Sequence, residues 1–195
     1  MDLKTNKKRK GFTLIELLIT VVILGILVSL AVPSMYQILE GRKLKGATEN
    51  LFADLMFAKT ETIKRNTKVA ISFGSSGTDW CYGLSVDTDC DCTNALLAIP
   101  TATTCTIDGI EKVVTNEPYG DTIISVVSFA GNSGGDPEAA GFEPLRGFSQ
   151  YITSSGYANG STKFSNNGRE AVVMLSTLGR VRICSGTGFG GYESC

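Results

Sequence analysis

The chain has 195 residues with 18 basic and 19 acidic side chains, and residues 12–195 alone carry 13 basic against 18 acidic ones. This acidic balance excludes a protein whose whole surface is cationic and coats nucleic acid. Histidine is absent and six cysteines are present, which favours disulfides in an oxidising compartment over zinc sites or thiol catalysis.

The first 35 residues join a basic leader to a long apolar segment. Residues 4–10 contain five basic side chains, whereas residues 14–35 contain one charged side chain, Glu16. A helix over this apolar segment, at about 1.5 Å per residue, is long enough to cross a hydrocarbon core of about 30 Å. We therefore expect one membrane-spanning helix, with the basic leader in the cytoplasm and the rest of the chain on the other side.

A cleaved secretory signal is the alternative, because Ser29, Leu30 and Ala31 form a small-x-small cleavage site. Glu16 disfavours this alternative. A carboxylate in the apolar segment costs about 2.5 to 3.5 kcal/mol at the bilayer centre, and an ordinary signal peptide gains nothing from it. In the first turn of a helix the macrodipole favours an anion, but the charge still requires a function of its own.

The Gly11-Phe12 junction, followed by Glu16 within the apolar run, resembles the N-terminus of type IV pilins and type II secretion pseudopilins. The resemblance implies that prepilin peptidase cuts after Gly11 and that Phe12 becomes the methylated N-terminal residue. It also implies that Glu16 neutralises the free amine of a neighbouring subunit during assembly. The precursor would be held in the inner membrane by one span, with its C-terminal domain in the periplasm. It would then enter an extracellular pilus with other pilin subunits. Pro33 and Gly25 mark positions where such a helix bends or melts.

The segment after the apolar run is amphipathic. Apolar side chains recur at steps of three and four residues, which predicts that one helix runs from Phe12 to about Arg65. Asn66, which tolerates the left-handed conformation, is the expected stop. The expected organisation is a leader at 1–11, a transmembrane or filament-core helix at 12–35, an amphipathic helix at 36–66 and a β-rich domain at 67–195. The apolar stripe consists of Leu44, Ala47, Leu51, Leu55 and Ala58.

Short β-rich runs, separated by glycine and polar residues, follow Asn66. They predict antiparallel sheets packed on the helix, so the expected fold class is α+β, and the resemblance implies the same pilin architecture. Residues 131–141 are predicted to form an exposed flexible loop. The predicted strands are Lys68–Phe73, Trp80–Val86, Thr122–Phe129, Phe148–Thr153, Ser161–Ser165, Ala171–Ser176 and Arg180–Cys184.

The cysteine spacing leaves the disulfide pairing open. Cys90 and Cys92 are too close to pair with each other, so each is expected to join Cys81, Cys105 or a tail cysteine. For the tail we expect a bridge from Cys184 to Cys195, worth about 3 kcal/mol through loop entropy. A four-thiolate metal site is disfavoured because the chain has no second compact cysteine pair.

Asp87, Asp89 and Asp91 resemble the start of a calcium loop. Cys92 and Ala98, however, stand where an EF-hand needs glycine and glutamate. A solvated loop pinned by disulfides is the favoured interpretation, and we expect no metal or cofactor.

Charge is distributed unevenly along the domain. Residues 66–144 hold two basic side chains against 11 acidic ones, whereas residues 145–195 hold five basic against two acidic. This asymmetry predicts an anionic partner near the C-terminus. In a strand, Arg180 and Arg182 point to one face with Val181 and Ile183 on the other, so two guanidinium groups can grip adjacent phosphates.

The run from Gly179 to Arg182 resembles the GRxR motif of FimT-type minor pilins, which bind DNA during natural transformation. With the N-terminus, it makes the chain similar to the GspH/FimT group of minor pilins and pseudopilins. The resemblance implies a DNA site at Gly179, Arg180 and Arg182, and the charge pattern adds Lys163 and Arg169. Residues 186–191 match GxGxxG, but no helix can follow to bind a phosphate. We expect a mobile rim there, held by the tail bridge.

The predicted function is binding of double-stranded DNA, without sequence preference, for uptake in natural transformation. The alternative is a structural tip or priming subunit of a type IV pilus or a type II secretion pseudopilus, with no nucleic acid ligand. An enzyme is not expected, because histidine is absent, the cysteines are expected to pair and no serine is expected at a nucleophile elbow. Trp80 and Tyr82, at strand spacing, are expected to pack in a sheet rather than stack on bases.

Overall fold

The computed structural model describes residues 11–76, 78–93, 105–130, 139–151 and 158–195, without the side chains of residues 32–34, 129, 130 and 151. The predicted metal-loop position at Ala98 and the end of the predicted strand at Thr153 lie outside the described residues. Contacts divide the chain into two compact units, one ending at Leu39 and the other running from Glu40 to Cys195.

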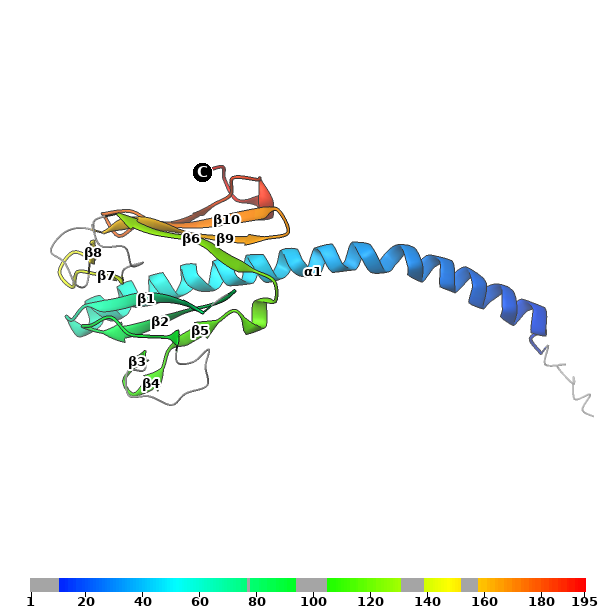
Figure 1. Cartoon of the computed structure of the whole chain (residues 1–195), viewed down its shortest axis with the longest axis horizontal. Helices are drawn as coiled ribbons and strands as arrows, with labels where there is room; N and C mark the ends of the chain where they lie inside the picture. Colours follow the sequence, from blue (N-terminus) through cyan, green and yellow to red (C-terminus); the bar gives the residue numbers. More distant parts are fainter. Residues whose placement is uncertain (1–10, 77, 94–104, 131–138, 152–157) are drawn as a thin grey trace, which may run out of the picture. The chain divides into compact units, whose positions relative to one another are not determined.

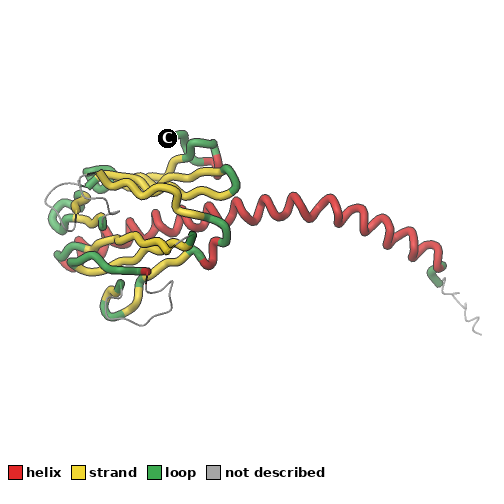
Figure 2. Tube along the Cα trace, viewed as in Figure 1, coloured by secondary structure: helices red, strands yellow, loops and turns green. Residues whose placement is uncertain are grey.

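The N-terminal unit contains the first part of helix α1, which runs from Leu14 to Arg65 (Figure 2). The helix continues through Gly25 and Pro33. The helix begins later than the expected Phe12 because Thr13 precedes it as an N-cap. The Thr13 hydroxyl oxygen accepts the backbone N–H of Glu16 at 3.3 Å. Large apolar side chains up to Leu30 are exposed, and an 18-residue window has a mean hydropathy of 2.8. By length and composition, this helix can cross a membrane.

The second unit places the rest of α1 against two antiparallel sheets, which form separate layers in Figure 1. One sheet has five strands in the order β5-β2-β1-β7-β8, and the other has four in the order β11-β10-β9-β6. A third pairing joins β3 to β4. The strands are β1 Val69–Ser76, β2 Asp79–Val86, β3 Thr106–Ile107, β4 Ile110–Glu111, β5 Val113–Thr115, β6 Ile123–Ala130, β7 Ala140–Phe142, β8 Ser149–Tyr151, β9 Asn159–Asn166, β10 Arg169–Leu175 and β11 Val181–Cys184, with short 3₁₀ helices η1 Glu117–Tyr119 and η2 Phe189–Gly191.

The predicted apolar stripe of α1 is the centre of the core. All five of its residues are buried, with exposed fractions of 2% or less. They pack in one cluster with the inner faces of both sheets, for example Ile71 from β1 and Val173 from β10. Removing such side chains from water at about 25 cal/mol per Å² is the main favourable contribution to the fold. One long helix followed by antiparallel sheets confirms the expected α+β pilin architecture.

Asn66 ends the helix as expected, since its φ of 52° is left-handed. Every predicted strand has a counterpart, but the prediction missed four short strands, β3, β4, β5 and β7. The predicted loop at 131–141 is wrong at its end. Ala140 and Gly141 belong to β7, where they pair with Ile71 and Ala70 and are buried. Small residues with low strand propensity gave no signal there, because pairing with β1 and β8 decides the conformation.

Trp80 and Tyr82 pack in the core, as expected from their strand spacing. Their exposed fractions are 2% and 0%, and their rings stack with centroids 6.3 Å apart. The indole N–H of Trp80 donates to the Thr122 carbonyl at 2.7 Å, so its polar atom is satisfied inside the core. Neither ring is available to a base.

Two disulfides cover the face of the five-stranded sheet that points away from α1. Cys81 pairs with Cys92, and Cys90 pairs with Cys105, which resolves the open pairing. The tail bridge from Cys184 to Cys195 forms as expected. Gly83 on β2 leaves room for the second bridge, because a Cβ built there would lie 2.2 Å from the Cys105 sulfur.

An arginine at the end of α1 ties the helix to the β3–β4 hairpin. The Arg65 guanidinium donates to both carboxylate oxygens of Asp108, at 2.6 and 2.5 Å, and its Nε donates to Glu61 at 2.6 Å. These hydrogen bonds hold the pKa of both carboxyl groups below their ordinary values. The network therefore requires ionised carboxylates.

We expect Gly83→Ala to lower the free energy of unfolding by about 2 to 3 kcal/mol, because the new methyl group displaces the Cys90–Cys105 bridge. The measurements are thermal melting and a count of free thiols in the unfolded protein. Gly186→Ala is the control, since a Cβ there has its nearest neighbour at 3.6 Å. An unchanged melting temperature with no free thiol would contradict this packing.

We expect the stability contributed by Arg65 to be present at neutral pH and lost in acid. The folded-state pKa values of Asp108 and Glu61 are lowered, so the contribution is complete above their ordinary values of about 4 and disappears as the pH falls through the lowered ones. The difference in melting temperature between wild type and Arg65→Gln should shrink from pH 7 to pH 3. Arg42→Gln, at an exposed position of α1, is the control. A difference that stays constant over this range would refute the assignment.

Candidate nucleic-acid interface

Of the two candidate arginines, Arg180 directly precedes β11, at the end of the turn from β10, and Arg182 is the second residue of β11. The Gly179 N–H donates to the Ser176 carbonyl at 2.8 Å, and the Ser176 N–H donates to the Arg180 carbonyl at 3.0 Å. Gly179 has a φ of 70°, which is the left-handed position of a short hairpin loop and favours glycine. The turn therefore fixes the position of the Arg180 backbone at the end of the hairpin loop.

The predicted alternation holds along this strand. Arg180 and Arg182 are exposed, Val181 is buried and Ile183 is half-buried against the core. In the described part of the chain β11 is an edge strand of the four-stranded sheet, with β10 as its one paired strand. Alternate residues of a strand are about 7 Å apart, so the two arginine side chains leave one face from Cα atoms separated by about that distance.

A cleft of about 600 Å³ lies beside the arginines. Arg180 and Arg182 line it together with polar side chains on one hand and with Met174, Leu175 and Leu178 on the other. Hydroxyl and amide groups that neighbour two arginines suit a phosphodiester, because they add neutral donors beside the two cations. The polar lining residues are Asn159, Ser161, Ser176 and Thr177. Ser161 and Ser176 lie in predicted strands, but none of the four is charged, so the charge pattern gave no signal for them.

Gly179 is required by close packing as well as by its left-handed backbone conformation. A Cβ built at Gly179 would lie 1.9 Å from the Gly147 carbonyl oxygen, so no side chain fits there. The Lys59 ammonium on α1 donates to the Gly179 carbonyl at 2.9 Å. The helix therefore holds the turn that carries Arg180 through a contact that spans 120 positions of the sequence. Sequence reasoning gave Lys59 no such function.

The structure brings one of the two added cations to this face and not the other. Lys163 on β9 is two residues from Ser161, which shares a cross-strand row with Met174 and Arg182. From strand spacing, its Cα lies about 12 Å from that of Arg182 on the same face of the sheet. The Lys163 ammonium pairs with the Glu170 carboxylate at 3.2 Å.

Arg169 lies on the helix side of the sheet. A Cβ built at Gly41 of α1 would be 3.3 Å from an Arg169 guanidinium nitrogen, and the guanidinium lies 5.9 Å from the centre of the Phe189 ring. These contacts place Arg169 away from the face that carries Arg182.

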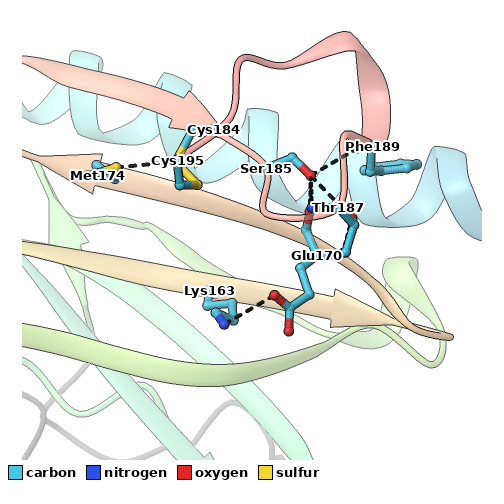
Figure 3. Close-up of a disulfide and its surroundings, with 8 residues drawn as sticks. All are labelled: Lys163, Glu170, Met174, Cys184, Ser185, Thr187, Phe189 and Cys195. Atoms are coloured by element: carbon cyan, nitrogen blue, oxygen red, sulfur yellow. Dashed lines mark hydrogen bonds and ion pairs between the residues drawn. A yellow bond between two sulfur atoms is a disulfide. The ribbon is translucent and has the colours of Figure 1, made fainter.

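The C-terminal loop after β11 is closed by the Cys184–Cys195 bridge (Figure 3). The Ser185 hydroxyl is its hub. It donates to the Glu170 carbonyl at 2.6 Å and accepts the Phe189 N–H at 3.0 Å. The Phe189 ring lies within 3.4 Å of a Cβ built at Gly41. The loop is therefore anchored to the four-stranded sheet and to α1, which differs from the free rim expected from its glycines.

Tyr192 adds a second contact between this loop and α1. Its hydroxyl donates to the Glu49 carboxylate at 3.1 Å, and the Lys45 ammonium lies 5.9 Å from the centre of its ring. Partial burial, with Glu49 beside it, raises the pKa of Tyr192 to about 12, so the phenol remains a neutral donor at pH 7.

The predicted processing and assembly residues lie at the start of the chain that the structure describes. Gly11, Phe12 and Glu16 are all exposed. Among the described residues, no group of three or more cysteine, aspartate or glutamate side chains is placed to hold a metal ion. In the loop that contains Asp87, Asp89 and Asp91, Cys90 and Cys92 form disulfides.

Comparison with protein families gives two matches that agree with these features. Residues 6–32 match the prokaryotic N-terminal methylation motif, and residues 47–192 match the type II transport protein GspH family. Neither a curated protein nor a solved structure matches the chain. The methylation motif fits processing by prepilin peptidase, and with the apolar helix it fits anchoring in the inner membrane and assembly with other pilin subunits. Members of this family are structural subunits rather than enzymes. Because the second match covers most of its length, the chain belongs to the GspH family of type IV pilin-like and pseudopilin subunits.

Proposed function

We propose that this pilin subunit binds the phosphates of double-stranded DNA on the outer face of its four-stranded sheet and serves DNA uptake in natural transformation. The observation that carries the proposal is the pair of exposed arginines beside a cleft that also presents hydroxyl and amide side chains. The domain would face the periplasm before assembly and stand on the surface of a pilus afterwards. Phosphate contacts carry no sequence information, so recognition is independent of base sequence.

Charge supports this face over the rest of the domain. The four strands β6, β9, β10 and β11 contain three basic side chains and one acidic side chain, in a chain that is acidic beyond its leader. Of these cations, Arg182 stands on the outer face beside the cleft, where Arg180 joins it. Arg169 lies on the helix side of the sheet, and Lys163 is paired with Glu170. Such a local cationic field attracts a polyanion even when the net charge is negative.

Two arginines in one subunit give weak binding, with a dissociation constant on the order of 10⁻⁴ to 10⁻⁶ M at physiological salt. Useful affinity then arises when several subunits, or neighbouring pilins, contact one duplex. Weak binding by a single domain and strong salt dependence are both part of the proposal.

A structural subunit of a type II secretion pseudopilus is the second candidate. The family match favours it, because the family is named for type II transport. This candidate requires subunit contacts along the helix and does not require DNA binding at the arginines. Substituting the two arginines therefore distinguishes the two candidate functions.

We expect Arg180→Gln with Arg182→Gln to abolish DNA binding by the unit from Glu40 to Cys195, measured by gel shift and fluorescence anisotropy at low salt. Both side chains are exposed, so the melting temperature should change little. Arg42→Gln with Lys43→Gln is the matched control, because it removes two exposed cations from α1. Equal DNA affinity for wild type and the β11 variant would leave the structural candidate.

We expect Gly179→Ala to destabilise the domain by about 2 kcal/mol or more and to weaken DNA binding, because the methyl group pushes the turn away from Gly147 and displaces Arg180. Gly168→Ala is the control. It has a similar φ of 77° but nothing within 4 Å of the built Cβ, so it should cost less. If both variants melt at the same temperature and bind alike, the packing of Gly179 does not position the site.

A further inference from the structure

We propose that Glu170 limits the DNA affinity of this face by holding Lys163 in an ion pair, an inference that rests on the proposed function. Glu170 is a positioning residue here. It makes no contact with DNA of its own, and it determines whether a third cation is available beside the arginines.

The first observation is the position of Glu170. It is the one acidic residue in the sequence of strands β6, β9, β10 and β11. On β10 it is four residues from Met174, which pairs with Arg182, so the two side chains leave the same face of the sheet. A carboxylate on a face that receives phosphates repels them.

The second observation is that Glu170 is fixed in place. Its backbone N–H donates to the Thr187 hydroxyl at 3.3 Å, and its carbonyl accepts the Ser185 hydroxyl at 2.6 Å. A Cβ built at Gly186 would lie 3.6 Å from Glu170 Oε2, so the disulfide-closed loop borders the carboxylate. Figure 3 shows Ser185 and Thr187 beside Glu170, with the carboxylate directed toward Lys163.

The third observation is the ion pair itself. The Lys163 ammonium lies 3.2 Å from Glu170 Oε2, and the two side chains are 34% and 37% exposed. Both are therefore accessible to a ligand at the surface. With its charge neutralised, Lys163 adds little to the field around the cleft, although its Cα lies only about 12 Å from that of Arg182.

The geometry allows one duplex to reach all three cations. Successive charges on one DNA strand are separated by about 3.4 Å along the helix axis, so the distance of about 12 Å between the Cα atoms of Arg182 and Lys163 corresponds to roughly four phosphates. Freed from Glu170, Lys163 would become an additional phosphate contact at the end of the row that Arg180 and Arg182 begin.

The test compares Glu170→Gln with wild type in the chain processed at Gly11, held in neutral detergent micelles, with a 30-base-pair duplex as the probe. We expect Glu170→Gln to bind about three- to tenfold more tightly at low salt. The slope of log affinity against log salt should become steeper by about 0.9, the value for one more neutralised phosphate. Adding Lys163→Gln should remove both gains. A merely structural function of Glu170 would not move the salt slope.

Glu111→Gln is the matched control, since it removes one exposed carboxylate from β4 in a different sheet. An equal gain in Glu111→Gln would show a net-charge effect and overturn the inference. So would an unchanged or weaker affinity of Glu170→Gln, provided that Arg180→Gln with Arg182→Gln still abolishes binding in the same assay, because the proposed function then stands. If that arginine variant binds like wild type, the proposed function fails and the inference fails with it.

Discussion

Burial of one helical stripe by two sheets is the constraint on which the domain depends. Leu44, Leu51 and Leu55 reach the inner faces of both sheets in a single cluster, so neither sheet has a core without α1. Each sheet consequently has one face committed to the helix and one face left for another purpose. The two outer faces differ in chemistry. The one on the five-stranded sheet contributes to stability, and the one on the four-stranded sheet carries the proposed binding site.

The outer face of the five-stranded sheet is covered by two disulfide bonds. Cys81, Cys92 and Cys105 are buried in a second small cluster there, where Gly83 makes room for a sulfur atom. The outer face of the four-stranded sheet has hydroxyl groups, an arginine pair and a cleft instead. An acidic chain can thus present a local cationic surface, because its acidic residues are concentrated in the other part of the domain.

Local periodicity predicted the helix, its stripe, seven strands and the alternation around Arg182, because each depends on neighbours a few residues apart. Contacts between distant segments were not predictable in this way. Ala140 and Gly141 form a strand because β1 and β8 pair with them on either side. The position of Arg169 depends on the strand register and on Phe189, and the support of Gly179 by Lys59 joins α1 to the β10–β11 turn. The charge pattern alone therefore grouped Arg169 with Lys163, whereas the fold separates them.

The most direct measurement of the central claim is a residue-by-residue map of DNA contact by NMR. A short duplex titrated into isotope-labelled domain should shift the amide signals of Ser161, Thr177, Arg180 and Arg182, with the shifts decreasing as salt is added. Signals of β1, β2 and the residues around Cys81 and Cys105 should remain in place. Shifts centred on the disulfide-covered sheet, or none at millimolar DNA and low salt, would contradict a phosphate-binding face at the arginines.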